Sequence, residues 1–472
     1  MNIHTKILPV ILSGGTGSRL WPTSRKSLPK QFINFSDTDT LFFQTLLRGK
    51  QIDTQGKPII ISSKDYGFLC RREALKLSIK ADYILEEIGR NTAPAIYFSS
   101  KFAMENHKNA ILCFMPSDHW VEDDTKFAEM IKSGTKLAND GNWVTFGIKP
   151  HEPNTGYGYI NVQKNTNQAY DVISFEEKPD YKTAKTYLEK GNYFWNSGIF
   201  LVTAEKCLES FKKLQPELTK QADKVWNNRM IKKDESILLK SDLEKLTSIS
   251  VDYAIMEQEK DVKLLPFNGE WSDVGSWDSL SKIISKTNSE KIVSKDNQVL
   301  IDSKNTFVHT TDRTIVGIGL EDLIVVDDDD ATIISKKGET EKIKNALEIL
   351  KSKNNKSSEE HTFEYRPWGK FENLLETEIY KVKRLTIDPG EHLSIQYHKK
   401  RSEHWVVVDG KASVQLNDKK LTLEKGQSID IPKGSSHCLG NDTKENLVVI
   451  EVQLGDYFGE DDIVRISDPY DR

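Results

Sequence analysis

The hydrophobic pattern of the first 280 residues is the feature that most constrains how this chain can fold. Short apolar runs, such as Lys6–Leu12, Pro58–Ile61 and Ala110–Met115, alternate with stretches of helical period at 72–80 and 125–138. This alternation predicts a mostly parallel sheet with helices covering its faces. The fold class expected for this region is therefore α/β, with a mixed, mostly parallel, Rossmann-like sheet.

The pattern changes after residue 290. Up to residue 340, short β-branched runs (Thr314–Ile318, Leu323–Val326 and Ala331–Ile334) are separated by turn residues, which leaves no room for crossover helices. This predicts a small β-rich module, and a β-helix is one form that it could take. The acidic run Asp327–Asp330 lacks the spaced ligands of a calcium loop, so we expect a solvated turn there.

A third region follows a polar linker. Residues 339–352 have helical spacing, and the tract 351–360 has almost nothing to bury, which is typical of a linker. Residues 363–458 contain short strands between glycine, proline and asparagine turns, which predicts an antiparallel β-barrel or sandwich. The expected boundaries are 1–285 for the α/β domain, 286–345 for the β-rich module, 346–362 for the helix end and linker, and 363–472 for the C-terminal barrel.

Composition excludes several classes of function. The chain has 472 residues, more than the roughly 250–300 at which a single core stops growing, so two or more domains are expected. A net charge of -5 gives no electrostatic reason to expect nucleic acid binding. Four widely spaced cysteines without a CxxC pair indicate neither a disulfide framework nor a thiolate metal site, and they fit a reducing cytoplasm. No run approaches the ~18–20 apolar residues that span a bilayer, so we expect neither a membrane protein nor a visible secretion signal.

A glycine-rich turn, Leu12–Pro22, follows the first apolar run. Small residues after a buried strand let backbone N–H groups approach phosphate oxygens, and Arg19 can add a bidentate charge. A strand-ending turn also needs glycine, so these glycines alone do not establish a phosphate site. The P-loop and Rossmann alternatives both fail, because no Gly-Lys-Ser/Thr is present and the third Rossmann glycine would fall at Leu20.

The longer run Gly14–Phe32, GGTGSRLWPTSRKSLPKQF, resembles the signature of the sugar-nucleotide pyrophosphorylases, specifically that of the mannose-1-phosphate guanylyltransferases. The resemblance extends over essentially the whole chain, because further blocks typical of this family occur in order. These blocks are Gly89–Ala95, Pro116–Trp120, Gly156–Ile160, Glu177–Pro179, Asn196–Phe200 and Trp271–Trp277. One departure is Glu176, which stands where an apolar strand residue is typical and could alter local packing or sugar affinity.

The resemblance implies a set of site residues. Asp118 follows an apolar run at the predicted carboxyl end of a strand, where ligands bind in open α/β sheets. By resemblance, Asp118 and Asp273 would coordinate Mg²⁺, an ion that suits hard carboxylate ligands. The implied nucleotide-binding residues are Ser13, Gly14, Gly15, Thr16, Gly17, Arg19, Lys30, Arg90 and Asn91. The implied sugar-binding residues are Gly158, Glu177, Lys178 and Asn196.

The reaction implied by the resemblance is attack of a mannose 1-phosphate oxygen on the α-phosphorus of GTP, with pyrophosphate leaving in line. No protein nucleophile is required, so positioning and charge neutralisation would carry the catalysis. Arg19 and Lys30 would stabilise charge on the triphosphate, and Lys178 would hold the sugar phosphate. Outside its block, either lysine would be interpreted as an ordinary surface residue.

A second site is predicted after the linker, where both halves of a cupin spacing occur. The first half is Gly390-x5-Gln396-x-His398-x4-Glu403-x6-Gly410, and the second is Gly426-x5-Pro432-x-Gly434-x2-His437-x3-Asn441. Gln396 and His398 lie two residues apart and would share one face of a strand. Two imidazoles, one carboxylate and one amide oxygen (His398, His437, Glu403 and Gln396) predict a site for Zn²⁺ or another divalent metal.

The segment Gln396–Trp405 resembles the motif of the type II phosphomannose isomerases, and the whole-chain arrangement resembles the bifunctional isomerase and guanylyltransferase proteins. That family interconverts fructose 6-phosphate and mannose 6-phosphate by proton transfer between C1 and C2. Arg401 is the candidate for phosphate binding or charge stabilisation, and the proton-transferring base is left open. Arg366–Gly369 also resembles a block of this family, to which no role is assigned.

Three functions remain in view. The leading hypothesis is a cytoplasmic bifunctional enzyme that supplies GDP-mannose for polysaccharide synthesis. The nearest alternative is a monofunctional guanylyltransferase whose cupin domain binds metal or mediates oligomerisation without catalysis. A sugar-nucleotide-binding regulator without turnover would be expected to lack catalytic cations or metal ligands, yet all of those named above are present. The sequence leaves open a homodimer or higher oligomer.

Overall fold

The computed structural model describes residues 6–15, 17–35, 39–52, 57–163, 169–287 and 297–470. The chain folds as two compact units. The first comprises Met1–Ser24, Pro29–Val293 and Lys337–Glu341, and the second comprises Arg25–Leu28, Ser294–Lys336 and Lys342–Arg472. The run Gly14–Phe32, called the signature loop below, is therefore divided between the two units, because its residues 25–28 group with the second unit.

The first unit is built on a mixed sheet, in which eleven strands fall within the described residues. They are β1 (Ile7–Ser13), β2 (Ile59–Ser63), β3 (Asp82–Glu86), β4 (Ile111–Pro116), β6 (Trp143–Ile148), β7 (Tyr159–Gln163), β8 (Tyr170–Glu176), β9 (Tyr193–Thr203), β10 (Met230–Lys232), β11 (Glu235–Leu238) and β12 (Val262–Phe267). The order is β10-β11-β3-β2-β1-β4-β9-β6-β12-β8-β7. The neighbours β11, β3, β2, β1 and β4 run parallel, as the alternating sequence pattern predicts.

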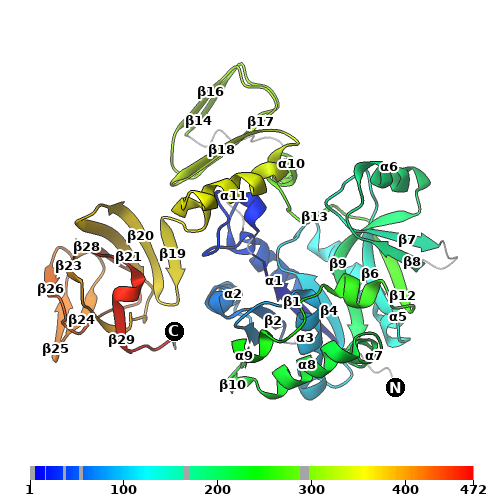
Figure 1. Cartoon of the computed structure of the whole chain (residues 1–472), viewed down its shortest axis with the longest axis horizontal. Helices are drawn as coiled ribbons and strands as arrows, with labels where there is room; N and C mark the ends of the chain where they lie inside the picture. The colour runs from blue at the N-terminus through cyan, green and yellow to red at the C-terminus, as the bar shows by residue number, and fades with distance from the viewer. Residues whose placement is uncertain are drawn as a thin grey trace. The chain divides into compact units, whose positions relative to one another are not determined.

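Most helices of the first unit flank this sheet (Figure 1). The helices of the unit are α1 (Leu41–Ile52), α2 (Gly67–Lys76), α3 (Thr92–Asn106), α4 (Asp124–Ser133), α5 (Thr135–Asn139), α6 (Tyr181–Lys190), α7 (Ala204–Leu214), α8 (Pro216–Asn227), α9 (Lys240–Leu243) and α10 (Trp277–Thr287). Helix α3 packs on α7 and α8, and α1 packs on α4. None of the helices in the described part of the chain is long and apolar enough to cross a membrane.

The central strand β1 fixes where the glycine-rich loop begins. Six of its seven residues are buried, because it pairs in parallel with β2 on one side and β4 on the other. The registers Ser13↔Ser62 and Leu12↔Pro116 bring the carboxyl ends of three strands to one edge. The glycine-rich loop and the segment after Pro116 therefore leave the sheet at the same edge, where open α/β sheets bind ligands.

The second unit contains the β-rich module. Its strands are β14 (Gln298–Ile301), β15 (Phe307–Thr310), β16 (Ile315–Ile318), β17 (Leu323–Asp328) and β18 (Ala331–Lys336), followed by helix α11 (Ile343–Ser352). Strand β14 pairs in parallel with β16, and β15 pairs in parallel with β17. Parallel pairs offset by 17 residues produce the stacked coil in Figure 1, as expected for a β-helix.

The acidic run in this module corrects one expectation. Asp327 and Asp328 are not in a solvated turn: they end β17 and are 3% and 4% exposed. Asp327 accepts hydrogen bonds from Thr310, Thr332 and the Arg313 guanidinium. Burial raises the pKa of Asp327, but these donors outweigh it, so the pKa is lowered. Asp327 is therefore a buried carboxylate paired with Arg313, whereas Asp329 and Asp330 are exposed in the expected turn between β17 and β18.

The C-terminal region consists of two antiparallel sheets, as the cupin spacing predicts. One has the order β19-β20-β21-β28-β23-β26 and the other β25-β24-β27-β22-β29. Their strands are β19 (Phe363–Arg366), β20 (Gly369–Glu376), β21 (Tyr380–Ile387), β22 (Ile395–His398), β23 (Arg401–Asp409), β24 (Ala412–Leu416), β25 (Lys419–Leu423), β26 (Ser428–Ile431), β27 (His437–Gly440), β28 (Leu447–Gly455) and β29 (Ile463–Ser467). A core that includes Trp405, Leu439 and Val449 lies between the sheets.

A buried acid at the end of β3 generates a test of the first unit. Glu86 is 7% exposed, and its Oε1 atom has no hydrogen-bond partner among the described residues. Burial raises its pKa from 4.5 to about 8. The folded state therefore binds more protons than the unfolded state between these values, so this contribution to stability is present below pH 4.5 and is lost as the pH rises through 8.

We expect Glu86→Gln, which is neutral at every pH, to remove this dependence. At about 1.4 kcal/mol per pKa unit, the variant should gain roughly 2–4 kcal/mol of unfolding free energy relative to wild type between pH 5 and pH 8. Denaturant unfolding at both values measures the gain. An unchanged difference between the two proteins would show that Glu86 is ionised in the folded state.

Candidate functional site

The glycine-rich loop presents open backbone at the carboxyl end of β1. Ser13 is buried at the end of the strand, whereas Gly14 and Gly15 are exposed. A Cβ atom at Gly15 would meet no protein atom, but the residue has a φ of 80°, which favours glycine. Both glycines therefore leave the backbone accessible to an anion. Thr16, also predicted to bind nucleotide, lies outside the described residues.

The position of the Lys30 side chain requires a glycine at residue 17. Gly17 has a φ of 64°, and a Cβ atom there would lie 2.6 Å from Lys30 Cγ. The lysine stem thus packs against the glycine backbone, and its residue is 8% exposed. Its Nζ lies 2.9 Å from Asp118 Oδ2 and donates to the carbonyl of Asp273 at 2.7 Å. Lys30 thereby connects the signature loop to both segments that carry the predicted magnesium ligands.

Two short strands bring these aspartates together. Strand β5 (Trp120–Val121) follows Asp118, and β13 (Trp271–Ser272) precedes Asp273. The two strands pair antiparallel, with Ser272 opposite Trp120. Asp273 Oδ1 accepts hydrogen bonds from the Tyr157 hydroxyl at 3.1 Å and the Gly275 amide at 3.0 Å. The arrangement supplies hard oxygen donors from two loops, which fits Mg²⁺.

Asp118 is held in its charged form. Desolvation raises its pKa, but the Lys30 ammonium and then His119 outweigh this effect, and the pKa is lowered. His119 Nε2 lies 3.8 Å from Asp118 Oδ1, and burial lowers the pKa of His119. A lowered pKa favours the ionised carboxylate that a cation site requires.

The predicted sugar-binding residues also lie together. The backbone N–H of Asn196 donates to the carbonyl of Gly158 at 2.8 Å. A Cβ atom at Gly158 would lie 2.7 Å from Glu177 Oε2. Lys178 Nζ lies 2.6 Å from Glu177 Oε1, while its side chain is 55% exposed. These blocks from three parts of the sequence therefore form one polar cluster. The exposed ammonium is available to an anionic group of a ligand.

Asp252, which the sequence analysis missed, completes this cluster. It begins the π-helix η4 (Asp252–Met256) and accepts a hydrogen bond from Asn196 Nδ2 at 2.8 Å. Burial, followed by repulsion from Glu177, raises its pKa. No family block was recognised around Asp252, so the sequence offered no signal for it.

The remaining predicted nucleotide-binding residues lie at two places. Arg90 donates through Nε to the carbonyl of Leu243, and Asn91 caps helix α3 by accepting from the Thr92 amide at 2.8 Å. These are structural contacts, and they fix the segment that follows β3. Within the described residues, the Arg19 guanidinium forms no hydrogen bond or ion pair and is half-buried beside the glycines.

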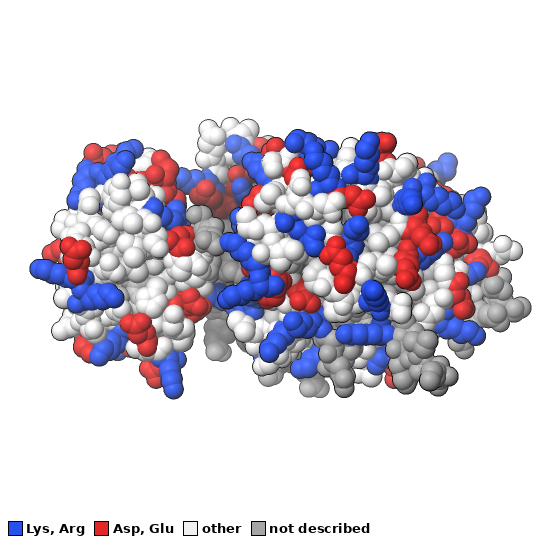
Figure 2. All heavy atoms as spheres, turned by 90° about the horizontal axis from the view of Figure 1, so that it is seen from below, with Lys and Arg blue, Asp and Glu red and all other residues white. Residues whose placement is uncertain are grey.

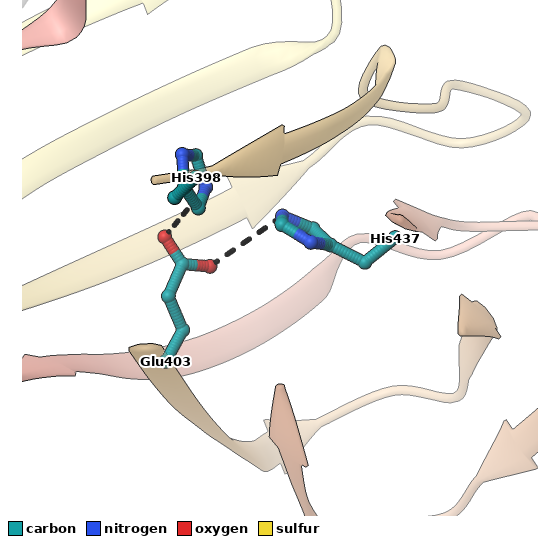
Figure 3. A group of neighbouring side chains, drawn as sticks. All are labelled: His398, Glu403 and His437. Carbon is teal, nitrogen blue, oxygen red and sulfur yellow. Dashed lines mark ion pairs between the residues drawn. The ribbon is translucent and has the colours of Figure 1, made fainter. Parts of the chain in front are cut away.

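The second predicted site is a compact cluster of His398, Glu403 and His437. Their ligand atoms all lie within 4.8 Å of one another, and all three residues are buried. His398 ends β22, Glu403 lies in β23 and His437 begins β27. Figure 3 shows the Glu403 carboxylate between the two rings, with one oxygen facing each. Oε1 lies 3.0 Å from His398 Nε2, and Oε2 lies 3.8 Å from His437 Nε2.

Backbone contacts orient both imidazoles toward this cluster. His437 Nδ1 lies 2.9 Å from the carbonyl of Ser435, and His398 Nδ1 lies 3.4 Å from that of Asp462. These contacts at Nδ1 direct both Nε2 atoms toward the Glu403 carboxylate, where a metal ion would be held. His437 Nε2 is buried without a hydrogen-bond partner among the described residues. An orphaned buried nitrogen that faces a carboxylate fits a divalent metal ion.

Charges around the cluster favour the ionised form of Glu403. Burial raises the pKa of Glu403, but His398, His437 and Arg401 outweigh it and hold the pKa well below its ordinary value. Burial also lowers the pKa of His437. Gln396, the fourth predicted ligand, pairs across the sheet with His437, so both side chains lie on the same face. Its Oε1 accepts from the Ser394 hydroxyl at 2.8 Å.

Three further residues, Trp405, Gln453 and Glu451, form a hydrogen-bond network with Glu403, and the Trp405 ring also packs against His437 with centroids 5.5 Å apart. Trp405 Nε1 donates to Glu403 Oε2 at 3.1 Å, and Gln453 Nε2 donates to Glu403 Oε1 at 3.2 Å. Both donors are shared with Glu451, at 3.2 and 2.7 Å respectively. Burial and the charge of Glu403 raise the pKa of Glu451. The cupin spacing ends before β28, so it could not identify Glu451 and Gln453.

Comparison with known proteins divides the chain into three matched regions. Residues 8–290 match the model of the nucleotidyl transferase family, and residues 353–468 match that of the mannose-6-phosphate isomerase C-terminal region. Residues 296–350 match the MannoseP isomerase/GMP-like beta-helix domain. The first match alone covers more than half of the chain.

Curated relatives match over the full length. A xanthan biosynthesis protein, XanB, from Xanthomonas campestris pv. campestris (strain B100) is 39% identical over 467 residues, which cover 99% of both chains. Mannose-1-phosphate guanylyltransferase 2 from Escherichia coli O157:H7 is 38% identical over 475 residues, with 98% of both chains covered. The chain belongs to the mannose-1-phosphate guanylyltransferase family.

A solved structure supports the fold assigned to this guanylyltransferase family member. A protein from Thermus thermophilus, named mannose-1-phosphate geranyltransferase, is 27% identical, with a TM-score of 0.65. The match covers 74% of this chain and all of that one. The family carries both the nucleotidyl transferase region and the isomerase-type C-terminal region, so the two clusters described above lie in its two matched regions.

The donors around Glu403 generate a prediction for the cupin-type cluster. Trp405→Phe keeps a buried ring but removes the N–H group that holds Glu403 Oε2. We expect the affinity for Zn²⁺ to fall about 10- to 100-fold, as is typical when a group that orients a metal ligand is lost. Zinc titration against a chromophoric chelator measures this change.

A matched control is Trp368→Phe, which alters a buried tryptophan of the same core, on the turn between β19 and β20 rather than beside the ligands. Its zinc affinity should stay within about twofold of wild type. Equal zinc affinity in wild type and Trp405→Phe would contradict the positioning role of Trp405.

Proposed function

We propose that the protein transfers the GMP group of GTP to mannose 1-phosphate, releasing pyrophosphate and forming GDP-mannose. The observation that carries this proposal is the convergence of the glycine-rich loop, Lys30, Asp118 and Asp273 at one edge of the sheet. Relatives named as mannose-1-phosphate guanylyltransferases over the full length support this substrate pair. Polysaccharide synthesis as the destination of the product rests on XanB.

Each group of this site has a defined task. The open backbone at Gly14 and Gly15 would receive the phosphates, and Arg19 and Lys30 would offset charge that develops during the displacement. A bound Mg²⁺, held by Asp118 and Asp273, would neutralise phosphate oxygens. Lys178 would orient the sugar phosphate, and Asn196 and Glu177 would bind sugar hydroxyls. Positioning and electrostatics suffice, because no covalent intermediate is needed.

Local cations must hold these anionic ligands. The face drawn in Figure 2 shows Lys and Arg side chains interspersed with Asp and Glu over the described residues. A mixed surface of this kind does not concentrate polyanions. The charge arrangement therefore supports a small phosphorylated substrate held in a local site.

We further propose that the C-terminal region interconverts mannose 6-phosphate and fructose 6-phosphate. The buried His398, Glu403 and His437 cluster supports this activity, since Zn²⁺ or another divalent metal bound there would polarise the substrate oxygens at C1 and C2. Arg401 is 2% exposed and donates to Glu403 Oε1 at 3.2 Å. It would stabilise negative charge beside the ligands. The alternative, a cupin region that binds metal without catalysis, predicts metal affinity without isomerisation.

The guanylyl transfer is tested at Lys178, whose exposed ammonium belongs to the sugar-binding cluster. We expect Lys178→Ala to lower kcat/KM for mannose 1-phosphate at least about 100-fold, because a charge-assisted contact to the phosphate is lost together with its orientation. Pyrophosphate release from GTP and mannose 1-phosphate measures the rate. The matched control is Lys182→Ala, an exposed lysine in the first turn of α6, which should stay within about twofold of wild type.

Two outcomes would contradict this proposal. Equal losses in Lys178→Ala and Lys182→Ala would remove the assigned role of Lys178. Absence of pyrophosphate release by wild type with GTP and Mg²⁺ would reject the reaction itself.

The isomerase proposal is tested by metal removal. We expect protein stripped with a chelator to lose mannose 6-phosphate isomerisation and to regain it when Zn²⁺ or another divalent metal is restored. His437→Ala should not regain it, because its Nε2 lone pair is gone. A coupled assay for fructose 6-phosphate measures the rate. If zinc-loaded wild type binds the metal but does not isomerise, the cupin region is non-catalytic.

A further inference from the structure

Three cations surround one carboxylate beside the His398, Glu403 and His437 cluster. Lys383 lies in β21, Arg366 ends β19 and Arg401 begins β23. Lys383 and Arg366 approach Glu460 in the short helix η7 (Glu460–Asp462), and Arg401 approaches the residue before it. Lys383 Nζ donates to Glu460 Oε1 at 3.3 Å. Arg366 Nη2 lies 3.8 Å from Glu460 Oε2 and 2.9 Å from Oε2 of Glu364, its nearer partner. Arg401 Nη1 donates to the neighbouring carbonyl of Gly459 at 3.2 Å.

Lys383 is unusual because its charge is inside the barrel. Its side chain is 7% exposed, and its strand neighbour across the sheet is the buried Glu451. Burying an ammonium group costs several kcal/mol unless it is paired, and Glu460 forms an ion pair with it. Both Lys383 and Arg366 also lie over the buried ring of Phe371, at 4.8 and 5.5 Å from its centroid. Both cations therefore pack against the same buried aromatic ring.

Glu460 is the most exposed of the acids beside these cations. Its side chain is 49% exposed, that of Glu364 is 31% exposed, and those of Glu403 and Asp462 are 2% exposed. Asp462 is fixed, because it accepts from the amides of Lys399 and Lys400, each at 3.1 Å. Glu460 has no comparable backbone donors among the described residues. Burial raises its pKa, but Lys383 and Arg366 outweigh this effect and the pKa is lowered.

Arg401 connects this group to the metal-ligand cluster. Its Nε donates to Glu403 Oε1 at 3.2 Å, its Nη2 lies 3.5 Å from His398 Nε2, and its Nη1 reaches Gly459. One guanidinium therefore separates the proposed metal from the carboxylate of Glu460 and its cations. A ligand with one reactive end and one distant anionic end would span these two places.

We propose that Lys383 and Arg366 form the binding subsite for the phosphate of a hexose 6-phosphate, and that the Glu460 carboxylate holds this subsite until the phosphate displaces it. This inference rests on the proposed isomerase function, for which it names the phosphate-binding groups. A phosphate monoester carries more charge than a carboxylate and offers three acceptor oxygens to a lysine and a forked arginine. The exposed Glu460 side chain can turn outward, while Lys383 cannot leave the barrel without losing the contact to Phe371.

The experiment measures binding of sorbitol 6-phosphate, which resembles the open-chain sugar phosphate and cannot be isomerised. Zinc-loaded, full-length protein is titrated by calorimetry with GDP-mannose present to fill the nucleotidyltransferase site. Unphosphorylated sorbitol serves as the ligand control. Lys383→Met and Arg366→Gln should each weaken the affinity about tenfold or more, because each removes a charge-assisted contact. The matched control Lys370→Met alters a lysine of β20 that pairs with Glu372 and should leave the affinity within about twofold.

The direction of the affinity change in Glu460→Gln distinguishes the proposal from a purely structural ion pair. It removes the competing charge while preserving size, so we expect the affinity to rise about threefold or more. A merely structural ion pair predicts the reverse, since Glu460→Gln and Lys383→Met would then both loosen the barrel and neither would bind more tightly. Weaker or unchanged binding in Glu460→Gln overturns the proposal. Lys383→Arg, which keeps the charge, should bind more tightly than Lys383→Met.

The two proposals can fail separately. If zinc-loaded wild type isomerises mannose 6-phosphate while Lys383→Met and Arg366→Gln retain the wild-type affinity and KM, the subsite is rejected and the isomerase stands. If the variants shift the affinity as expected while wild type does not isomerise, the subsite stands and the isomerase is rejected. If wild type binds sorbitol 6-phosphate no better than sorbitol, the subsite is overturned.

Discussion

The buried ammonium of Lys30 is the interaction on which the first site depends. A buried charge is tolerated when it is paired and hydrogen-bonded, and Lys30 finds its partners in Asp118 and the carbonyls of Asp273 and Val274. Its stem fits because residue 17 is glycine. The pairing of β5 with β13 brings the two aspartate segments within reach. The glycine-rich loop, the two aspartate segments and the sheet edge are therefore connected through Lys30.

The second site uses the opposite arrangement, with a buried carboxylate at its centre. Each oxygen of Glu403 faces one imidazole and accepts a hydrogen bond from Trp405 or Gln453, so both oxygens are oriented. This orientation is what a metal ligand needs before the metal arrives. The cations beside it are those that we propose to bind the phosphate of a sugar substrate.

Local sequence signals were sufficient for much of this account. Buried apolar runs identified β1 and β4, and the period of two residues placed Gln396 and His398 on one strand. The cupin spacing brought His398, Glu403 and His437 together because loop lengths fix which strand ends meet. The family resemblance identified the fold and the blocks that contain Gly158, Glu177 and Asn196, which the structure places in one cluster.

Other features depend on pairings that no local pattern records. In β21, the apolar residues Tyr380 and Val382 would be expected to face the core. The buried residues are instead Lys381, Lys383, Leu385 and Ile387. The pattern changes phase within the strand, so the buried lysine could not be predicted. The Asp327 and Asp328 side chains were expected to be solvated. They are buried because β15 pairs with β17, and Arg313, which follows β15, then reaches Asp327; the sequence alone does not show this contact. Glu86, Asp252 and Glu451 were missed for the same reason, since burial is decided by distant segments.

The central claim is that one chain carries two independent sites, and a crossed pair of variants tests it most directly. Asp118→Asn and His437→Gln are each assayed for both GDP-mannose formation and mannose 6-phosphate isomerisation under metal-replete conditions. The account predicts that Asp118→Asn loses at least about 100-fold in guanylyl transfer while isomerisation stays within about twofold, and that His437→Gln shows the reverse. Loss of both activities from either substitution, in protein that remains folded, would contradict two independent sites.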